Sequence, residues 1–147
     1  MIQYTNSRFI CGGRISLKLP NDVFIDFNPP VIPNEGLIFY SPDLKVTIDV
    51  NLVEADEDAR AFLESAREDF DTFHIVRELK HVSMGSLEGY GMTYALSDEI
   101  CEEYALTVPG AEPALFTVCL AQQLDELADA EIYAKLRDEL LAGIEPA

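Results

Sequence analysis

The strongest constraint on the fold is the shortness of the connections in the second half of the chain. Four segments rich in β-branched and aromatic residues follow one another there, at 73–84, 87–96, 100–108 and 114–120. Turn-forming residues fill the gaps between them, at 85–86, 97–99 and 109–113. Parallel pairing needs a crossover of about a dozen residues or more. The sequence therefore predicts four consecutive antiparallel strands.

The first half of the chain repeats the strand pattern in shorter pieces. The clearest segment is 45–53, whose apolar residues alternate with polar ones and are Val46, Ile48, Val50 and Leu52. This period of two predicts a strand with one buried face. Shorter strands are expected at 14–19, 23–27 and 37–40, after an irregular or strand-like lead-in over residues 1–13.

The turn-forming residues 20–22 predict that the second of these short strands returns beside the first. In 14–19 the apolar face would hold Ile15, Leu17 and Leu19, which leaves Arg14, Ser16 and Lys18 facing water. In the returning strand Val23, Ile25 and Phe27 would share one side. The prolines that follow, Pro29, Pro30 and Pro33, exclude a central strand from 28–36.

Two stretches have the periodicity of a helix instead. The first is 56–70, whose apolar stripe consists of Ala59, Phe62, Leu63, Ala66 and Phe70. The second stripe lies in 124–140 and consists of Leu124, Leu127, Ala128, Ile132, Leu136 and Leu140. Gly143 follows it as a candidate C-terminal cap.

The expected order of elements is about four strands, a helix, four strands and a helix. This order predicts an α+β fold, with a largely antiparallel sheet of about six to eight strands and two helices packed on it as an α/β/α sandwich. A length of 147 residues without a linker predicts one domain spanning 1–147.

Charge is distributed unevenly along the chain, whose formal net charge is −17. No lysine or arginine occurs between Lys80 and Lys135, and this stretch contains ten acids, namely Glu88, Asp98, Glu99, Glu102, Glu103, Glu112, Asp125, Glu126, Asp129 and Glu131. Such a surface repels polyanions, so we expect neither nucleic acid nor an anionic membrane as a partner. Two interpretations remain open, solvated acidic faces or an acidic face for a basic protein partner.

The candidate partner-binding residues lie in the densest part of this stretch. They are four acids and two tyrosines, namely Asp98, Glu99, Glu102, Glu103, Tyr90 and Tyr94. Glu102 and Glu103 are expected on opposite faces of one strand. The tyrosines, with Tyr104 and Phe116 on the following strands, either pack beneath a helix or line an exposed groove.

No motif for catalysis, cofactor binding or metal binding is found. His74 and His81 lie seven residues apart in one expected strand, which places them on opposite faces. The spacing of Gly85, Gly89 and Gly91 matches no phosphate-binding loop, and we expect a turn at the first and close packing at the others. No EF-hand calcium loop is present, although weak cation binding at the 97–99 turn stays open. We therefore expect no enzyme and no cofactor.

The cysteines and the N-terminus indicate a cytoplasmic protein. Three cysteines without a Cys-x-x-Cys spacing favour free thiols in a reducing compartment. Cys11 is expected to be exposed, Cys101 to face the core or a shallow groove, and Cys119 to be buried. No secretory signal pattern is present, and no apolar run approaches the roughly 20 residues of a membrane helix.

Several short motifs resemble those of the PsbP/DcrB-like group. They are R-I-S-L-K-L-P from Arg14, G-L-I-F-Y-S-P-D-L-K-V-T-I-D-V from Gly36, the acidic helix, and L-E-G-Y-G-M-T-Y from Leu87. The group includes the photosystem II subunit PsbP and a Ran-binding nuclear import factor. The resemblance implies an antiparallel sheet sandwiched by helices, and a binding or assembly role. It transfers no functional residue, because the matched positions are turns and core.

Several hypotheses for the function stay open. The first is a non-enzymatic binding or assembly module whose acidic face meets a basic protein partner. The alternatives are a small acidic dimeric chaperone of the secretion type, a neutraliser of a basic toxin, and a hydrolase that uses His81 with an acid. The chain is a monomer or a homodimer in these hypotheses.

Overall fold

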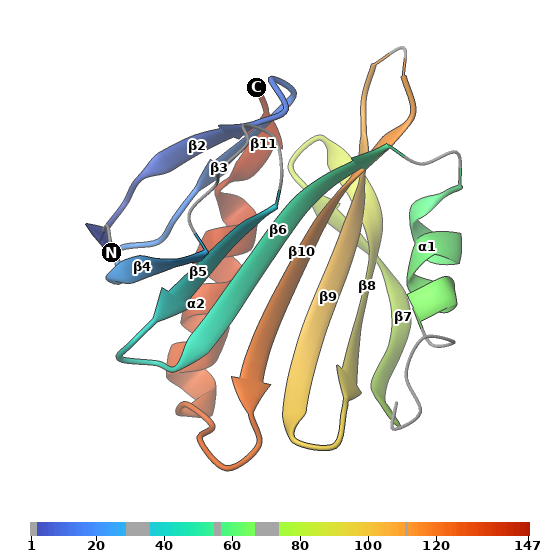
Figure 1. The fold of residues 1–147 in the computed structure, drawn as a ribbon. Helices are drawn as coiled ribbons and strands as arrows, with labels where there is room; N and C mark the ends of the chain where they lie inside the picture. Colours follow the sequence, from blue (N-terminus) through green and yellow to red (C-terminus); the bar gives the residue numbers. More distant parts are fainter. Residues whose placement is uncertain (1–2, 29–35, 55–56, 67–73, 111) are drawn as a thin grey trace.

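The computed structural model describes residues 3–28, 36–54, 57–66, 74–110 and 112–147. Its main element is an eight-stranded sheet in the order β1-β4-β5-β6-β10-β9-β8-β7, in which every neighbouring pair is antiparallel (Figure 1). The strands are β1 (Gln3–Tyr4), β4 (Phe24–Asn28), β5 (Leu37–Ser41), β6 (Val46–Glu54), β7 (His74–Met84), β8 (Leu87–Ala95), β9 (Glu99–Val108) and β10 (Ala114–Gln123). A small sheet in the order β11-β3-β2 contains β2 (Arg8–Cys11), β3 (Ile15–Lys18) and β11 (Ile144–Pro146).

The two helices cover opposite faces of the large sheet, as the sequence predicts. Helix α2 (Ala130–Ala142) and the small sheet share one hydrophobic core with strands β5, β6, β9 and β10. Helix α1 (Ala59–Ala66) packs over β8 and β9 on the other side, in a second core. Figure 1 shows α2 behind the left half of the sheet and α1 at its right edge. We call the two sides the α2 face and the α1 face.

Strand alternation divides the core residues between these two faces. In β10, Phe116, Val118 and Leu120 belong to the core of the α2 face, whereas Leu115 belongs to the core of the α1 face. The predicted alternation of 45–53 is confirmed, because Val46, Ile48 and Val50 are all buried in the first of these cores. The four consecutive antiparallel strands of the second half are confirmed as well.

Helix α1 begins later than the sequence predicts. The side chain of Asp58 accepts a hydrogen bond from the amide of Ala61 at 2.8 Å, which is the bond of an N-terminal cap. Ala59 and Leu63 turn inward and are buried. Asp56, Phe70 and Phe73 lie outside the described residues.

The apolar stripe predicted for 124–140 is wrong in its first half. Helix α2 begins at Ala130, because Asp129 accepts hydrogen bonds from the amides of Glu131 and Ile132 at its N-terminus. The residues before it form a connection in which the amide of Leu124 donates to the carbonyl of Asp98 at 2.9 Å. The helix buries Leu136, Leu140 and Leu141, whereas three residues of the predicted stripe are exposed, namely Leu124, Leu127 and Ile132. The C-terminal cap at Gly143 is confirmed.

The first half of the chain also differs from the prediction. In the described part of the chain, six strands precede α1 instead of about four, and two of them, β1 and β2, lie in the lead-in that was expected to be irregular or strand-like. The expected return of 23–27 beside 14–19 is wrong, because β3 and β4 belong to different sheets. Phe24, the first residue of β4, is buried, whereas Val23, which precedes the strand, is exposed. Ser16 is buried rather than wet, because β3 is the central strand of the small sheet and Arg8 donates to its hydroxyl.

Two glycines of β8 allow β9 to approach closely, as expected. A Cβ atom at Gly89 would lie 1.9 Å from the carbonyl oxygen of Ala105, and one at Gly91 would lie 2.6 Å from the ring of Tyr104. Gly85, in the preceding turn, has a φ of +61° and open space around it. Backbone contact therefore forbids a side chain at position 89, whereas only backbone strain opposes one at position 85.

We predict that Gly89→Ala lowers the free energy of unfolding by about 2 kcal/mol or more, because the backbone of β9 must move to admit the methyl group. Gly85→Ala is the matched control in the same hairpin. It should cost only about 1 kcal/mol, the strain of a left-handed alanine. Urea denaturation of both variants measures the difference. Equal losses would contradict the close approach of β8 and β9.

Candidate functional site

A groove lies on the α2 face between helix α2 and strand β7, and we call it the α2 groove. It consists of two hollows of about 400 and 380 Å³, which share Arg77, Thr93, Glu102 and Arg137 as lining residues. The first hollow extends to Met84 of β7, and the second to Leu127 before α2. The volumes are those of ordinary small-ligand sites.

Strand pairing arranges the groove residues in two rows across the sheet. One row contains Arg77, Thr93 and Glu102, which are cross-strand partners on β7, β8 and β9. The next row on the same face contains Lys80, Gly91 and Tyr104. Because Gly91 has no side chain, the ring of Tyr104 occupies the space above it. The groove thus has a low floor along β8.

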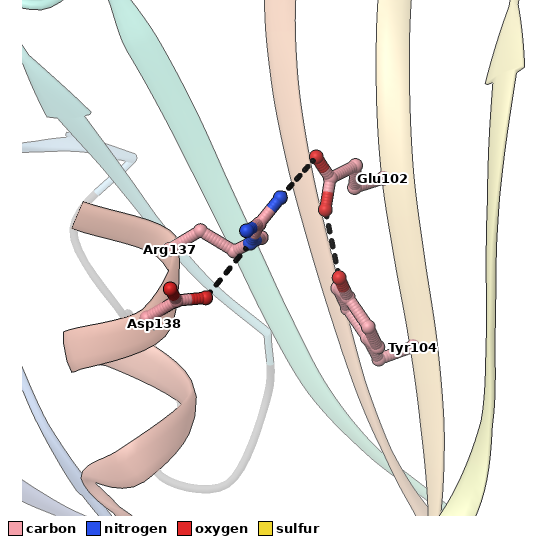
Figure 2. A network of polar contacts seen from close by, with 4 residues as sticks. All are labelled: Glu102, Tyr104, Arg137 and Asp138. Carbon is pink, nitrogen blue, oxygen red and sulfur yellow. Dashed lines mark hydrogen bonds and ion pairs between the residues drawn. The ribbon is translucent and has the colours of Figure 1, made fainter. Parts of the chain in front are cut away.

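A network of polar contacts joins α2 to the floor of the groove (Figure 2). Glu102 accepts a hydrogen bond from the hydroxyl of Tyr104 at 2.7 Å and one from Nη1 of Arg137 at 3.3 Å. Nε of Arg137 donates to Asp138 at 3.1 Å. The Glu102 side chain is only 12% exposed, so its charge needs this cationic partner in place. The ion pair fixes the distance between α2 and β9.

Tyr104 of this network and Tyr133 of α2 both have raised pKa values. Burial raises the pKa of Tyr104 well above its ordinary value, and the hydrogen bond to Glu102 raises it further. Burial also raises the pKa of Tyr133, again with a contribution from Glu102. The ring of Tyr133 lies 6.0 Å from the guanidinium carbon of Arg137. Such hydroxyls orient a ligand or a side chain by donating hydrogen bonds.

The predicted partner-binding residues do not form a single surface. Glu102 lies in the α2 groove, whereas Glu103 lies on the α1 face, so the expectation of opposite faces for this pair is confirmed. Tyr94 is buried beneath α1 and donates to Glu103 at 2.8 Å. Tyr90 packs against the same core, with His81 edge-on at 5.7 Å. These two tyrosines therefore pack beneath a helix.

The remaining two candidates, Asp98 and Glu99, lie at one end of the sheet. The connections 96–98 and 124–129 meet there, through the bond between the Leu124 amide and the Asp98 carbonyl, at the lower end of the molecule in Figure 1. We call this region the acidic end, and its carboxylates are Asp98, Glu99, Asp125, Glu126, Asp129 and Glu131. Lys45 forms an ion pair with Glu126 there, at 3.5 Å.

Two carboxyl groups on the α1 face are held in an unfavourable setting. Asp49, Cys119 and Glu103 are cross-strand partners on β6, β10 and β9. Burial raises the pKa of Glu103, and the charge of Asp49 adds to this effect, whereas the hydrogen bond from Tyr94 opposes it. Burial likewise raises the pKa of Asp49, against a hydrogen bond from Asn51. Both charges therefore cost stability at neutral pH.

The cysteines and histidines add no catalytic arrangement. The expected exposure of Cys11 is wrong, since it is buried against the core between the sheets, and burial raises its pKa. Cys101 faces a core as expected, whereas Cys119, which was expected to be buried, is only half-buried. His74 and His81 pair with Ala95 and Tyr90, which lie on opposite faces of β8. Within the described ranges, no three His, Cys, Asp or Glu residues are placed to hold a metal ion.

Sequence reasoning missed the cations of the groove. Arg77 and Lys80 are three residues apart, and a regular strand would turn them to opposite faces. In β7 the pairing register shifts between these two residues, so that Arg77 faces Thr93 and Lys80 faces Gly91. The irregularity brings both side chains to the α2 groove. Arg137 gave no signal either, since its ion pair with Glu102 joins residues that are far apart in the sequence.

The comparisons with known proteins identify the class of fold. No family model and no curated protein matches the chain. Among solved structures, LpqN of Mycobacterium tuberculosis, which is involved in cell envelope biogenesis, matches with a TM-score of 0.64 at 13% identity, over 90% of this chain and 83% of that one. A structure from Bacteroides thetaiotaomicron matches with a TM-score of 0.55 at 14% identity, over 98% of this chain and 49% of that one.

The chain thus has a fold similar to that of LpqN. It spans about half of the Bacteroides protein. The more specific resemblance to the PsbP/DcrB-like group stays a prediction. None of the helices in the described segments has the length and hydropathy needed to cross a membrane.

We predict that the protein becomes more stable as the pH falls from neutral into the acidic range. The folded state binds protons more tightly than the unfolded chain, because the pKa values of Glu103 and Asp49 are raised above 4.5 and 3.8. The free energy of unfolding therefore increases as the pH falls through the raised pKa values of the folded state. It stops increasing once the pH is below the ordinary pKa values of the unfolded chain. Thermal unfolding at a series of pH values measures the effect.

Glu103→Gln tests the assignment, since an amide can still accept the hydrogen bond from Tyr94. It should raise the free energy of unfolding at pH 7 by on the order of 1 kcal/mol, after allowance for partial exposure, and flatten the pH dependence. Glu88→Gln, at an exposed position, is the control for net charge. An equal gain in both variants would assign the effect to general charge repulsion instead.

Proposed function

We propose that the protein is a non-enzymatic binding module that docks a basic, partly apolar protein segment on its acidic end. The observation that carries this proposal is the mixture of carboxylates with exposed apolar side chains. Leu124, Leu127 and Ile132 are exposed by 43%, 55% and 52%, and they lie in the same connection and first helical turn as four of the six acids.

Charge supports a basic partner. Two neighbouring connections supply four of the six carboxylates, and Glu99 of β9 and Glu131 of α2 supply the others. Lys45 forms an ion pair with one of the six, Glu126. An electrostatic field of one sign steers an oppositely charged partner and speeds its association. Asp129 has a structural part as well, since it caps α2, so the other carboxylates are the better candidates for contact.

The exposed apolar residues support a partner that is not merely a polycation. Helix α2 covers its own buried face with Leu136, Leu140 and Leu141, and it leaves Ile132 facing outward. Burying a large apolar side chain contributes about 1.5–3 kcal/mol at full coverage. A segment that places basic residues beside apolar ones would contact both the carboxylates and the exposed apolar side chains. Removing either group is therefore expected to weaken binding.

We predict that the full chain captures basic proteins from a lysate of its source cells in low salt, and that capture depends on the acidic end. The charge variant is Asp98→Asn/Asp125→Asn/Glu131→Gln, and the apolar variant is Leu124→Ser/Ile132→Ser. Each should reduce capture about tenfold or more, and about 0.5 M salt should reduce it as well. Quantitative mass spectrometry of the bound fraction measures the change.

The matched control neutralises three exposed acids far from this end, Glu54→Gln/Glu57→Gln/Glu88→Gln. It changes the net charge by the same amount as the charge variant and should leave capture unchanged. The proposal fails if the control and the charge variant lose the same proteins. It fails as well if the captured proteins are acidic or are insensitive to salt.

A further inference from the structure

We propose that the α2 groove binds a small organic anion, whose carboxylate or phosphate group lies between Arg77 and Lys80 and accepts a hydrogen bond from Thr93, while its apolar body occupies the second hollow. The anion-binding part of this site is distinct from the acidic end and has the opposite charge preference, whereas the second hollow shares Leu127 with that end.

The first observation is a pair of cations without partners. Arg77 and Lys80 line the first hollow on adjacent rows of the same face. Neither forms a hydrogen bond or an ion pair with the residues that the structure describes. In a chain of 27 acids and 10 basic residues, two cations that face one groove without a carboxylate partner are unexpected. Arginine and lysine in such a position bind carboxylate or phosphate.

The second observation is a buried hydroxyl without a partner. Thr93 is the cross-strand partner of Arg77 on the floor of the groove, lines both hollows and is only 9% exposed. Its hydroxyl forms no hydrogen bond within the described part of the chain, although buried polar groups nearly always have one. Leaving such a group unpaired destabilises the folded state. A ligand oxygen at this point would remove that cost.

The network of Figure 2 engages Glu102, so that this carboxylate does not compete with a bound anion for Arg77 and Lys80. The carboxylate of Glu102 is engaged by Arg137 and Tyr104, and Asp138 engages the other side of Arg137. Glu102 is therefore neutralised by its own partner and does not take Arg77 from a ligand. The first hollow is lined by three acids, Glu78, Glu102 and Asp138, as well as by Arg77, Lys80 and Arg137. At physiological ionic strength, charges farther than about 8 Å are largely screened, so the acids elsewhere on the surface have little effect on this site.

The second hollow determines the rest of the ligand. Beside the shared residues, it is lined by the apolar side chains of Val76, Ile100, Leu127 and Ala134. A simple inorganic anion would leave this space unfilled. An acid group joined to an alkyl or aromatic body of moderate size fits both hollows, and the cations select it against neutral and positively charged analogues.

The experiment is a titration of the full chain, followed by NMR, with four probes that share one alkyl chain: octanoate, octyl phosphate, octanol and octylammonium, each below its micelle-forming concentration. Inorganic phosphate is the fifth probe. We expect the two alkyl anions to shift signals of the groove and to bind about tenfold or more tightly than octanol and inorganic phosphate. Equal binding of octanol and octanoate would overturn the proposal.

Two variants locate the site. Arg77→Gln/Lys80→Gln should weaken octanoate binding about tenfold or more, whereas Lys18→Gln/Lys135→Gln, with the same change of net charge, should not. Thr93→Val separates a ligand role from a structural one. It should weaken binding while leaving the stability of the free protein unchanged or increased, because it removes an unpaired hydroxyl. A loss of stability in Thr93→Val, or unchanged binding in the Arg77/Lys80 variant, would refute the site.

A vesicle sedimentation experiment distinguishes a free acid from a membrane lipid with the same anionic group. With a net charge of −17, the whole protein should not sediment with vesicles that contain phosphatidylglycerol. Sedimentation that depends on Arg77 and Lys80 would overturn the assignment to a free acid. Failure at the groove leaves the acidic end untouched, since none of these variants alters its residues.

Discussion

The fold depends on the pairing of β10 with two strands from different halves of the chain. One edge of β10 pairs with β6 from Ala114↔Glu54 to Gln122↔Val46, and the other pairs with β9 over its whole length. Without this strand the sheet would divide into β1-β4-β5-β6 and β9-β8-β7. Closing the chain between β6 and β10 costs entropy, which the packing of Phe116, Val118 and Leu120 beneath α2 offsets.

The groove follows from a mismatch between one helix and a wide sheet. Helix α2 and the small sheet bury the half of the α2 face that contains β5, β6 and β10. On the same face, β7 and β8 extend past the helix and present Arg77, Thr93 and Gly91 instead of large apolar side chains. The ion pair between Arg137 and Glu102 marks the border between the packed half and the hollow half.

The parts of the fold that sequence could predict are those set by local periodicity. The alternation in 45–53 and the tight turn after Met84 predict the observed strands, because successive side chains of a strand point to opposite faces of the sheet. The exposed residues Leu124 and Ile132 have helical spacing, yet the cap at Asp129 and the bond from Leu124 to Asp98 determine the outcome, and both depend on distant pairing. The sheet change between β3 and β4 has the same cause.

The candidate sites show the same division. The faces of Glu102 and Glu103 followed from the period of a strand, whereas the shared face of Arg77 and Lys80 depends on a register shift that no spacing reveals. Leu127 lines the second hollow and also lies among the carboxylates of the acidic end. An alkyl chain in the groove would therefore contact the surface proposed for a basic partner. By linkage, any effect of one occupant on the affinity of the other would be reciprocal.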